Sequence, residues 1–348
     1  MFAILRVLGA LLFSIFTLYG VFVAASLIVY PLSREQSMDT RDLTRSIFIN
    51  EPRYIVWNRA PLAKLSSKIV FIGSSNFRNA IVLDEIRQSF PDFDLHNLTA
   101  GSANIGMMGR AVELAEEAIP SAARSQTLFV VGIVFGNFND DYRAWNGLIS
   151  PLDRELVRFG LYEIDGQSLR NIVPVGLIPL LDIGLRPYLA LARLRYTLLT
   201  PPTKPAPTNV GRENDEERFR EANQRWAALL GTDGALDEKP FRDLALMAER
   251  IIGHGSQLVI VDMPVAAWFG ERSPHYADYQ AHKAERLRPV LALAGVHYID
   301  LQAVNDPGLF GDSTHPNAKG AAQISSMIGT RLRQMIDAGI IPIKAAQP

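Results

Sequence analysis

Short apolar runs separated by helix-like segments are the feature that most constrains the fold of this chain. The clearest runs are Ile69–Ile72, Thr127–Phe135, Leu258–Asp262 and Val296–Asp300, and they are rich in β-branched and aromatic residues. Runs of this length, with no polar alternation, are typical of strands that are buried on both faces. Because helical patterns lie between them, the order predicts an α/β fold with a parallel sheet covered by helices on both faces.

The N-terminal segment predicts a single membrane-spanning helix. No charged residue occurs from Val7 to Ser33. About 25 such residues form a helix of roughly 38 Å, which is long enough to cross a bilayer with some tilt. A cleaved signal peptide ending near Val23-Ala24-Ala25 is the alternative. The apolar run continues through Tyr30, which favours a retained anchor, and Arg6 favours a cytoplasmic N-terminus with the large domain in the periplasm or outside the cell.

Charge and cysteine content exclude several classes of function. The chain contains 35 basic and 36 acidic residues without a basic cluster, so we expect no nucleic-acid partner. It contains no cysteine, which excludes a thiolate nucleophile and any disulfide. With 348 residues, of which 48% are hydrophobic, we expect an anchor (1–33), a juxtamembrane connector (34–66) and one large domain (67–348) with an insertion at about 143–250.

The insertion has a mixed character. We expect helices with charged outer faces over Glu213–Leu230 and Pro240–Ile252, and no strand between Asp140 and Gln257. The proline-rich run Thr200–Pro207 reads as a surface loop or link. The segment 171–199 is apolar but interrupted by prolines. It is either a hydrophobic cover for the sheet or a surface that rests on a membrane or docks a partner, with Arg186, Arg193 and Arg195 at lipid head groups.

A serine follows the first predicted strand. Gly73-Ser74-Ser75 comes directly after Ile69–Ile72, and residues 76–89 show helical spacing. Ser75 is therefore expected at the carboxyl edge of the sheet, where its hydroxyl is exposed and its N–H can help to bind an oxyanion. The alternative interpretation is that Gly-Ser-Ser is only a turn that caps a helix.

A carboxylate and an imidazole lie close together near the other end of the domain. The sequence Gly311-Asp312-Ser313-Thr314-His315-Pro316 precedes a helical pattern, and Pro316 suits the first position of that helix. Asp312 would then lie one tight turn before His315. In this arrangement the carboxylate can hold one ring nitrogen while the other faces a nucleophile.

Two loops at predicted strand ends offer neutral hydrogen-bond donors. Residues 94–101 are expected to form a short strand followed by a loop with Gly101, and Asn137 and Asn139 follow the strand at 127–135. Ligands in open α/β sheets gather at such carboxyl ends. A glycine N–H and an asparagine amide suit a tetrahedral oxyanion, so Gly101 and either Asn137 or Asn139 are candidate oxyanion-hole residues.

Taken in order, these blocks resemble those of the SGNH (GDSL-like) hydrolase and acyltransferase superfamily. The resemblance covers about residues 67–145 and 255–335. It implies a flavodoxin-like three-layer sandwich and a site formed by Ser75, Gly101, Asn137 or Asn139, Asp312 and His315. Gly-Ser-Ser replaces the usual Gly-Asp-Ser, and the third block carries an extra residue.

The Gly-Ser-Ser block and the membrane anchor are most similar to the DltD-like proteins of cell-envelope polymer acylation. They also resemble anchored SGNH proteins that work with membrane-bound O-acyltransferases. The resemblance implies a bacterial inner-membrane acyltransferase or esterase, an acylated envelope polysaccharide as substrate and a partner in polysaccharide machinery. A non-catalytic adaptor that binds acyl or glycan groups and an esterase without a partner remain alternatives.

The sequence predicts neither a cofactor nor a catalytic metal. His275, Asp278 and His282 have the spacing of one helix face, but no fourth ligand accompanies them. We therefore expect a solvated helix with incidental histidines.

Overall fold

Five parallel strands form the centre of the protein. The computed structural model describes residues 2–29, 59–101, 103–139, 162–165, 168–171 and 215–343, together with positions 177, 180, 183, 184 and 187. The sheet has the order β2-β1-β3-β6-β7, and every neighbouring pair is parallel. The strands are β1 (Lys68–Gly73), β2 (Asp94–Asn97), β3 (Thr127–Ile133), β6 (Gln257–Asp262) and β7 (Val296–Asp300). The predicted parallel α/β sheet is confirmed.

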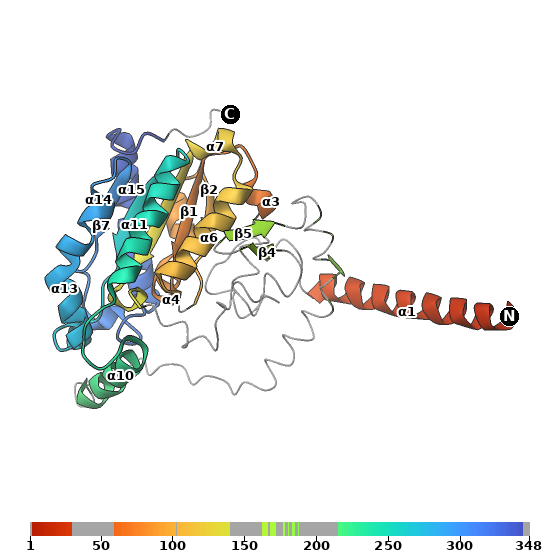
Figure 1. Cartoon of the computed structure of the whole chain (residues 1–348), viewed down its shortest axis with the longest axis horizontal. Helices are drawn as coiled ribbons and strands as arrows, with labels where there is room; N and C mark the ends of the chain where they lie inside the picture. The colour runs from red at the N-terminus through yellow and green to blue at the C-terminus, as the bar shows by residue number, and fades with distance from the viewer. Residues whose placement is uncertain are drawn as a thin grey trace.

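Helices cover both faces of this sheet. Helices α6 (Ile105–Ala118) and α11 (Glu238–Gly253) pack side by side over β1 and β6, whereas α4 (Ser75–Ala80), α5 (Leu83–Ser89) and α15 (Ala318–Asp337) pack together on the other face (Figure 1). The remaining described helices are α3 (Arg59–Leu62), α7 (Ser121–Arg124), η2 (Phe135–Asn137), α10 (Asp215–Leu230), α12 (Ala267–Gly270), α13 (Pro274–Arg286), α14 (Arg288–Leu291) and η6 (Pro307–Leu309).

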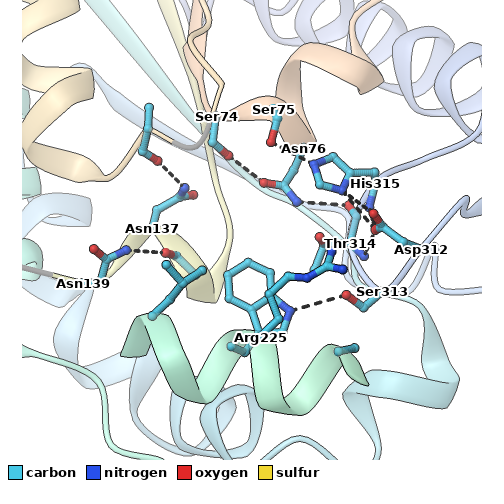
Figure 2. A pocket seen from close by; sticks show the side chains of 15 residues that line it. Ser74, Ser75, Asn76, Asn137, Asn139, Arg225, Asp312, Ser313, Thr314 and His315 are labelled. Atoms are coloured by element: carbon cyan, nitrogen blue, oxygen red, sulfur yellow. Dashed lines mark hydrogen bonds and ion pairs between the residues drawn. The ribbon is translucent and has the colours of Figure 1, made fainter. Parts of the chain in front are cut away.

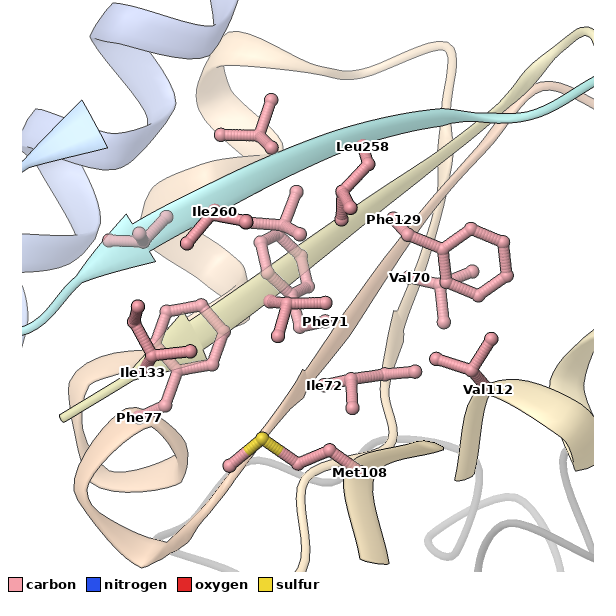
Figure 3. Packing of buried hydrophobic residues seen from close by; sticks show 14 of the residues in the cluster. Val70, Phe71, Ile72, Phe77, Met108, Val112, Phe129, Ile133, Leu258 and Ile260 are labelled. Atoms are coloured by element: carbon pink, nitrogen blue, oxygen red, sulfur yellow. The ribbon is translucent and has the colours of Figure 1, made fainter. Parts of the chain in front are cut away.

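Strand β1 contributes side chains to the hydrophobic core on both faces of the sheet. All six residues of this strand are buried, and successive side chains alternate between the two faces. Ile72 faces Met108 of α6, while Phe71 lies on the opposite side with Phe77 of α4, at a ring-centroid distance of 6.2 Å (Figure 3). One strand therefore fixes the helix layers on both sides of the sheet, including the short helix that begins at Ser75.

The single helix predicted over residues 76–89 is broken into α4 and α5. Ile81 and Val82 have extended backbone angles between the two helices. Ser325 of α15 satisfies the backbone at the break, since its hydroxyl donates to the carbonyl of Ala80 (2.6 Å) and accepts from the N–H of Val82 (2.7 Å). A partner from a distant helix thus replaces the local helical bonds, which spacing alone does not reveal.

The insertion contains structure that the sequence prediction missed. Strands β4 (Tyr162–Asp165) and β5 (Ser168–Asn171) pair in antiparallel fashion, so the expectation of no strand between Asp140 and Gln257 was wrong. The Asp-Gly dipeptide after Ile164 is a typical hairpin signal. Helices α10 and α11 lie where they were expected. Several predicted features lie outside the described residues: the Thr200–Pro207 run, Arg186, Arg193, Arg195 and most of 171–199 and 34–66.

One N-terminal helix stands apart from the α/β domain. Helix α1 (Phe2–Val29) projects from the α/β domain (Figure 1), and its Tyr19 hydroxyl donates to the carbonyl of Gly184. Its segment Ala3–Ile28 has a mean hydropathy of 2.3, and none of its most apolar window is buried. This helix is long and apolar enough to cross a membrane.

Helix α15 packs unusually close to the loop that precedes it. A Cβ added to Gly320 would lie 2.1 Å from the backbone oxygen of Leu309 in η6. Because a backbone atom cannot rotate away, we expect Gly320→Ala to lower the free energy of unfolding by about 3 kcal/mol. Urea denaturation measures this change.

Gly109→Ala is the matched control for this substitution. Gly109 also lies inside a helix, but nothing lies within 4 Å of an added Cβ. Alanine should therefore be neutral or stabilise the protein by up to about 1 kcal/mol. Equal effects of the two substitutions would contradict the assigned packing of α15 on η6.

Candidate active site

Ser75 lies where β1 ends and α4 begins. It is the first residue of α4, and Ser74 occupies the N-cap position in an extended conformation. The turn is tight, because a Cβ added to Gly73 would lie 2.7 Å from the Cβ of Phe77. The predicted position of Ser75, at the carboxyl edge of the sheet, is confirmed.

A chain of hydrogen bonds joins Ser75 to the distant Asp-x-x-His segment (Figure 2). The Ser75 Oγ lies 2.8 Å from the Nε2 of His315. The Nδ1 of His315 lies 2.8 Å from the Oδ2 and 3.0 Å from the Oδ1 of Asp312. An ionised carboxylate only accepts hydrogen bonds, so Nδ1 carries the hydrogen and Nε2 is left to accept the serine proton. The structure thus brings together the three residues that the sequence proposed as nucleophile, base and orienting acid.

Asp312 is held as an anion. Its Oδ1 accepts hydrogen bonds from the backbone N–H groups of Thr314 (2.9 Å) and His315 (2.8 Å). Burial alone would raise the pKa of the Asp312 carboxyl. This effect of burial is outweighed by the hydrogen bond and electrostatic attraction of His315 and by the two backbone N–H groups. Together they lower the pKa of the Asp312 carboxyl to about 2.

The His315 loop is fixed by contacts on both sides. The backbone N–H of Gly311 donates to the carbonyl of His315 (2.8 Å), and the N–H of Ala266 donates to the carbonyl of Ser313 (2.9 Å). Pro316 was expected as the first residue of the following helix, which was wrong. It forms an isolated bridge with Phe310 instead.

The start of α15 explains this difference. Asn317 is the N-cap, and its Oδ1 accepts from the N–H groups of Lys319 and Gly320, each at 3.0 Å. Asparagine is among the best N-cap residues, so the helix starts at Ala318, after the asparagine and not at the proline.

The candidate oxyanion-hole residues lie in different surroundings. Asn137 is buried; its Oδ1 accepts from the N–H of Val134 (2.7 Å) and its Nδ2 donates to the carbonyl of Ala103 (2.8 Å). Asn139 donates from Nδ2 to the carbonyl of Gly136 (2.8 Å). Each amide Nδ2 carries two hydrogens, so each asparagine retains a second donor. Both line the cavity beside Ser75, whereas Gly101 lies in the turn after β2 and does not line it.

Asn76 is a site residue that the sequence analysis missed. Its Oδ1 accepts from the hydroxyl of Ser74 (2.7 Å), and its Nδ2 donates to the carbonyl of Thr314 (3.3 Å). The side chain therefore ties the turn that carries Ser75 to the loop that carries His315. The Ser74 hydroxyl thereby orients this amide.

The insertion supplies one wall of the site. Trp226 of α10 packs on Phe135 at a ring-centroid distance of 4.8 Å, and its Nε1 donates to the hydroxyl of Ser313 (3.4 Å). A Cβ on Gly136 would lie 2.3 Å from the indole ring, so this glycine permits the contact. The sequence predicted α10 but gave no signal that it reaches the site, because the contact depends on how the insertion docks.

These elements enclose a cavity of about 300 Å³. This is the lower end of the range for small-molecule sites. Figure 2 shows side chains from the start of α4, from η2 and the residues after it, from α10 and from the His315 loop converging on this cavity. The lining residues are Ser74, Ser75, Asn76, Ala103, Gly136, Asn137, Asn139, Ala222, Arg225, Trp226, Leu229, Asp312, Ser313, Thr314 and His315.

The histidines of α13 have structural contacts. His275 was expected on a solvated helix, which was wrong, since it is 1% exposed and its Nε2 lies 2.8 Å from the carbonyl of Gly231. The Arg286 guanidinium donates a hydrogen bond to the Asp278 carboxylate (2.7 Å), and the Nδ1 of His282 lies 3.0 Å from an oxygen of the same carboxylate. Within the described residues, no group of three histidine, aspartate or glutamate side chains could hold a metal ion.

No family model matches the chain, and a search of curated proteins returns no similar sequence.

Proposed function

We propose that the protein is a serine esterase or O-acyltransferase of the SGNH type. The observation that carries this proposal is the continuous contact from Ser75 through His315 to Asp312 at the mouth of a cavity. A nucleophile, a base and a group that orients the base are the parts that covalent acyl transfer requires.

The topology of the sheet supports a flavodoxin-like arrangement. Counted within the five-stranded sheet, the strand order is 2-1-3-4-5, which is the order of flavodoxin-like folds. The direction in which successive strands are added to the sheet reverses between β1 and β3. In open α/β sheets, ligands bind at the carboxyl ends of the strands beside such a reversal. Ser75 follows β1 and Asn137 follows β3, so the cavity lies at this position.

The contacts support a two-step mechanism. The Ser75 Oγ attacks an ester carbonyl and gives its proton to His315 Nε2, forming a tetrahedral oxyanion. His315 then gives this proton to the leaving alcohol, and an acyl-serine ester remains. Water or a sugar hydroxyl next attacks this ester and loses its proton to His315, which passes a proton to the departing Ser75 oxygen as the acid or the new ester is released. Asp312 holds the Nδ1–H and stabilises the imidazolium in both steps.

The oxyanion would be held by the N–H of Ser75 and an asparagine amide. Asn137 is the better candidate because its Oδ1 is fixed by Val134 and its side chain is buried, so its amide is oriented before substrate binds. Gly101 does not line the cavity, and therefore its N–H contributes only if the turn after β2 moves.

The proposed substrate is an acylated cell-envelope polysaccharide, in line with the resemblance to anchored SGNH proteins. A membrane-bound O-acyltransferase or other polysaccharide machinery is the proposed partner. Helix α1 supports a membrane anchor. The proposed location is the bacterial inner membrane, with the α/β domain in the periplasm or outside the cell.

Labelling with a fluorophosphonate tests the enzymatic function. Wild-type protein should gain a covalent phosphonate on Ser75, which peptide mass spectrometry identifies. Ser75→Ala should stay unlabelled, and Ser121→Ala, an exposed serine outside the cavity, should label like the wild type. A folded wild-type protein that remains unlabelled would instead favour the adaptor, in which the cavity only binds acyl or glycan groups.

The location is tested by a reporter fused after residue 348. Alkaline phosphatase, which folds only outside the cytoplasm, should be active in this fusion, and the fusion should remain in the membrane fraction. Activity of a cytoplasmic reporter at the same point would reverse the proposed orientation. Release of the fusion as a soluble protein would favour a cleaved signal peptide.

A further inference from the structure

Arg225 is the cation at the site that the proposed mechanism does not use. It lies on α10, next to Trp226, and lines the same cavity as Ser75 and His315. Figure 2 shows its side chain rising from the helix toward Thr314 and His315. Apart from His315, it is the only basic residue among those that line the cavity in the described part of the chain.

Arg218 and Arg220, the other arginines of the helix, form ion pairs, whereas Arg225 forms none with the residues that the structure describes. Arg218 lies 3.6 Å from Asp215 and over the Trp268 ring, and Arg220 lies 4.0 Å from Glu217. Glu221, one helical turn before Arg225, has the spacing for a similar pair. Within the described residues, however, Arg225 has neither an ion pair nor a hydrogen bond. Its side chain lines the cavity.

The acidic residue of the cavity does not neutralise Arg225. Asp312 directs its carboxylate to His315 and to two backbone N–H groups, and it forms no ion pair with Arg225. The position of Arg225 is also fixed, since the next residue, Trp226, packs on Phe135 and bonds to Ser313. A charged guanidinium is therefore held at the mouth of the site, and no described residue accepts a hydrogen bond from it.

We propose that Arg225 forms an anion-binding subsite that selects substrates with a carboxylate or phosphate close to the esterified hydroxyl. The fork of guanidinium N–H groups matches two oxygens of either group. This inference rests on the proposed function, because that function places the scissile ester next to Ser75. It narrows the substrate class to anionic glycans or polyol phosphates. Because Arg225 is exposed, its attraction for such a group weakens with added salt.

Binding to the full chain in detergent tests the subsite without turnover. The Ser75→Ala variant prevents reaction, and isothermal titration measures its affinity for oligogalacturonate, oligomeric glycerol phosphate and neutral maltohexaose. One of the two anionic oligomers should bind tighter than maltohexaose, and the preferred one tells carboxylate from phosphate. Adding Arg225→Gln should weaken that binding about 10- to 100-fold, as expected for loss of a charged hydrogen-bond partner.

Arg220→Gln is the matched control on the same helix. It removes an equal charge outside the cavity, and it should leave the affinity unchanged. Arg225→Lys should restore part of the affinity, because the charge returns without the planar fork.

The proposal is overturned if maltohexaose binds as tightly as both anionic oligomers, if none binds, or if Arg225→Gln and Arg220→Gln behave alike. Anion binding that depends on Arg225 in a protein that fluorophosphonate does not label would retain the subsite and reject only the enzyme. The two proposals therefore fail separately.

Discussion

Ser75→Ala and His315→Ala should each lower the turnover of a model ester such as 4-nitrophenyl acetate by roughly 10⁵-fold or more. The first removes the attacking oxygen, and the second removes the base that lies 2.8 Å from it. The double variant should be no slower than either single one, because the two residues act as one unit. Steady-state kinetics of the three variants measures this.

The fold should survive both substitutions. Ser75 is only partly buried, and 32% of the His315 side chain is exposed, so neither supports the core. Circular dichroism and urea denaturation check this, with Ser121→Ala as a matched serine variant. Turnover by folded Ser75→Ala at the wild-type rate would remove this serine from the mechanism.

Asp312→Asn should lower turnover by about 10⁴-fold while the fold stays intact. An amide placed at 2.8 Å from His315 Nδ1 can donate to it, which favours the tautomer with its hydrogen on Nε2 and stops that nitrogen from accepting the serine proton. The loss should appear in kcat at every pH, because it does not arise from titration of the carboxyl.

The stability of the wild type relative to this variant should also change with pH. The folded-state pKa of Asp312, about 2, lies below that of an unfolded aspartate, about 3.9. The stabilisation by this carboxylate is therefore fully present above about pH 4 and is lost as the pH falls toward 2. The difference in free energy of unfolding between wild type and Asp312→Asn should shrink across this window.

Asp306→Asn provides the control for both measurements. Asp306 caps η6 through a hydrogen bond from the N–H of Gly308 (2.9 Å), which an asparagine oxygen can also accept. Turnover should stay close to that of the wild type. An Asp312→Asn enzyme that is equally active would show that the imidazole does not need the carboxylate.

The sequence predicted those features that depend on local chemistry. Buried parallel strands are apolar throughout, so β1 and β3 could be located within about one or two residues. Once the strands were placed, Ser75 and His315 had to lie near the same sheet edge. The contact between them is a consequence of this topology, although 240 residues separate the two side chains.

The features that were missed depend on docking between distant elements. Arg225 and Trp226 read as ordinary residues of a charged helix, and only the packing of α10 on Phe135 brings them to the cavity. The helix break at Ile81 depends in the same way on Ser325 of α15. A pattern along one segment does not contain this information.

The long separation between Ser75 and His315 also affects when the protein becomes reactive. A chain that emerges N-terminus first exposes Ser75 early, but without residues 312–315 the hydroxyl has no base and remains an ordinary alcohol. The Ser325 hydroxyl that closes the α4–α5 break arrives later still. Under the proposed mechanism, reactivity therefore begins only after nearly the whole domain has been synthesised and folded, and nascent chains and stalled fragments would not react with esters.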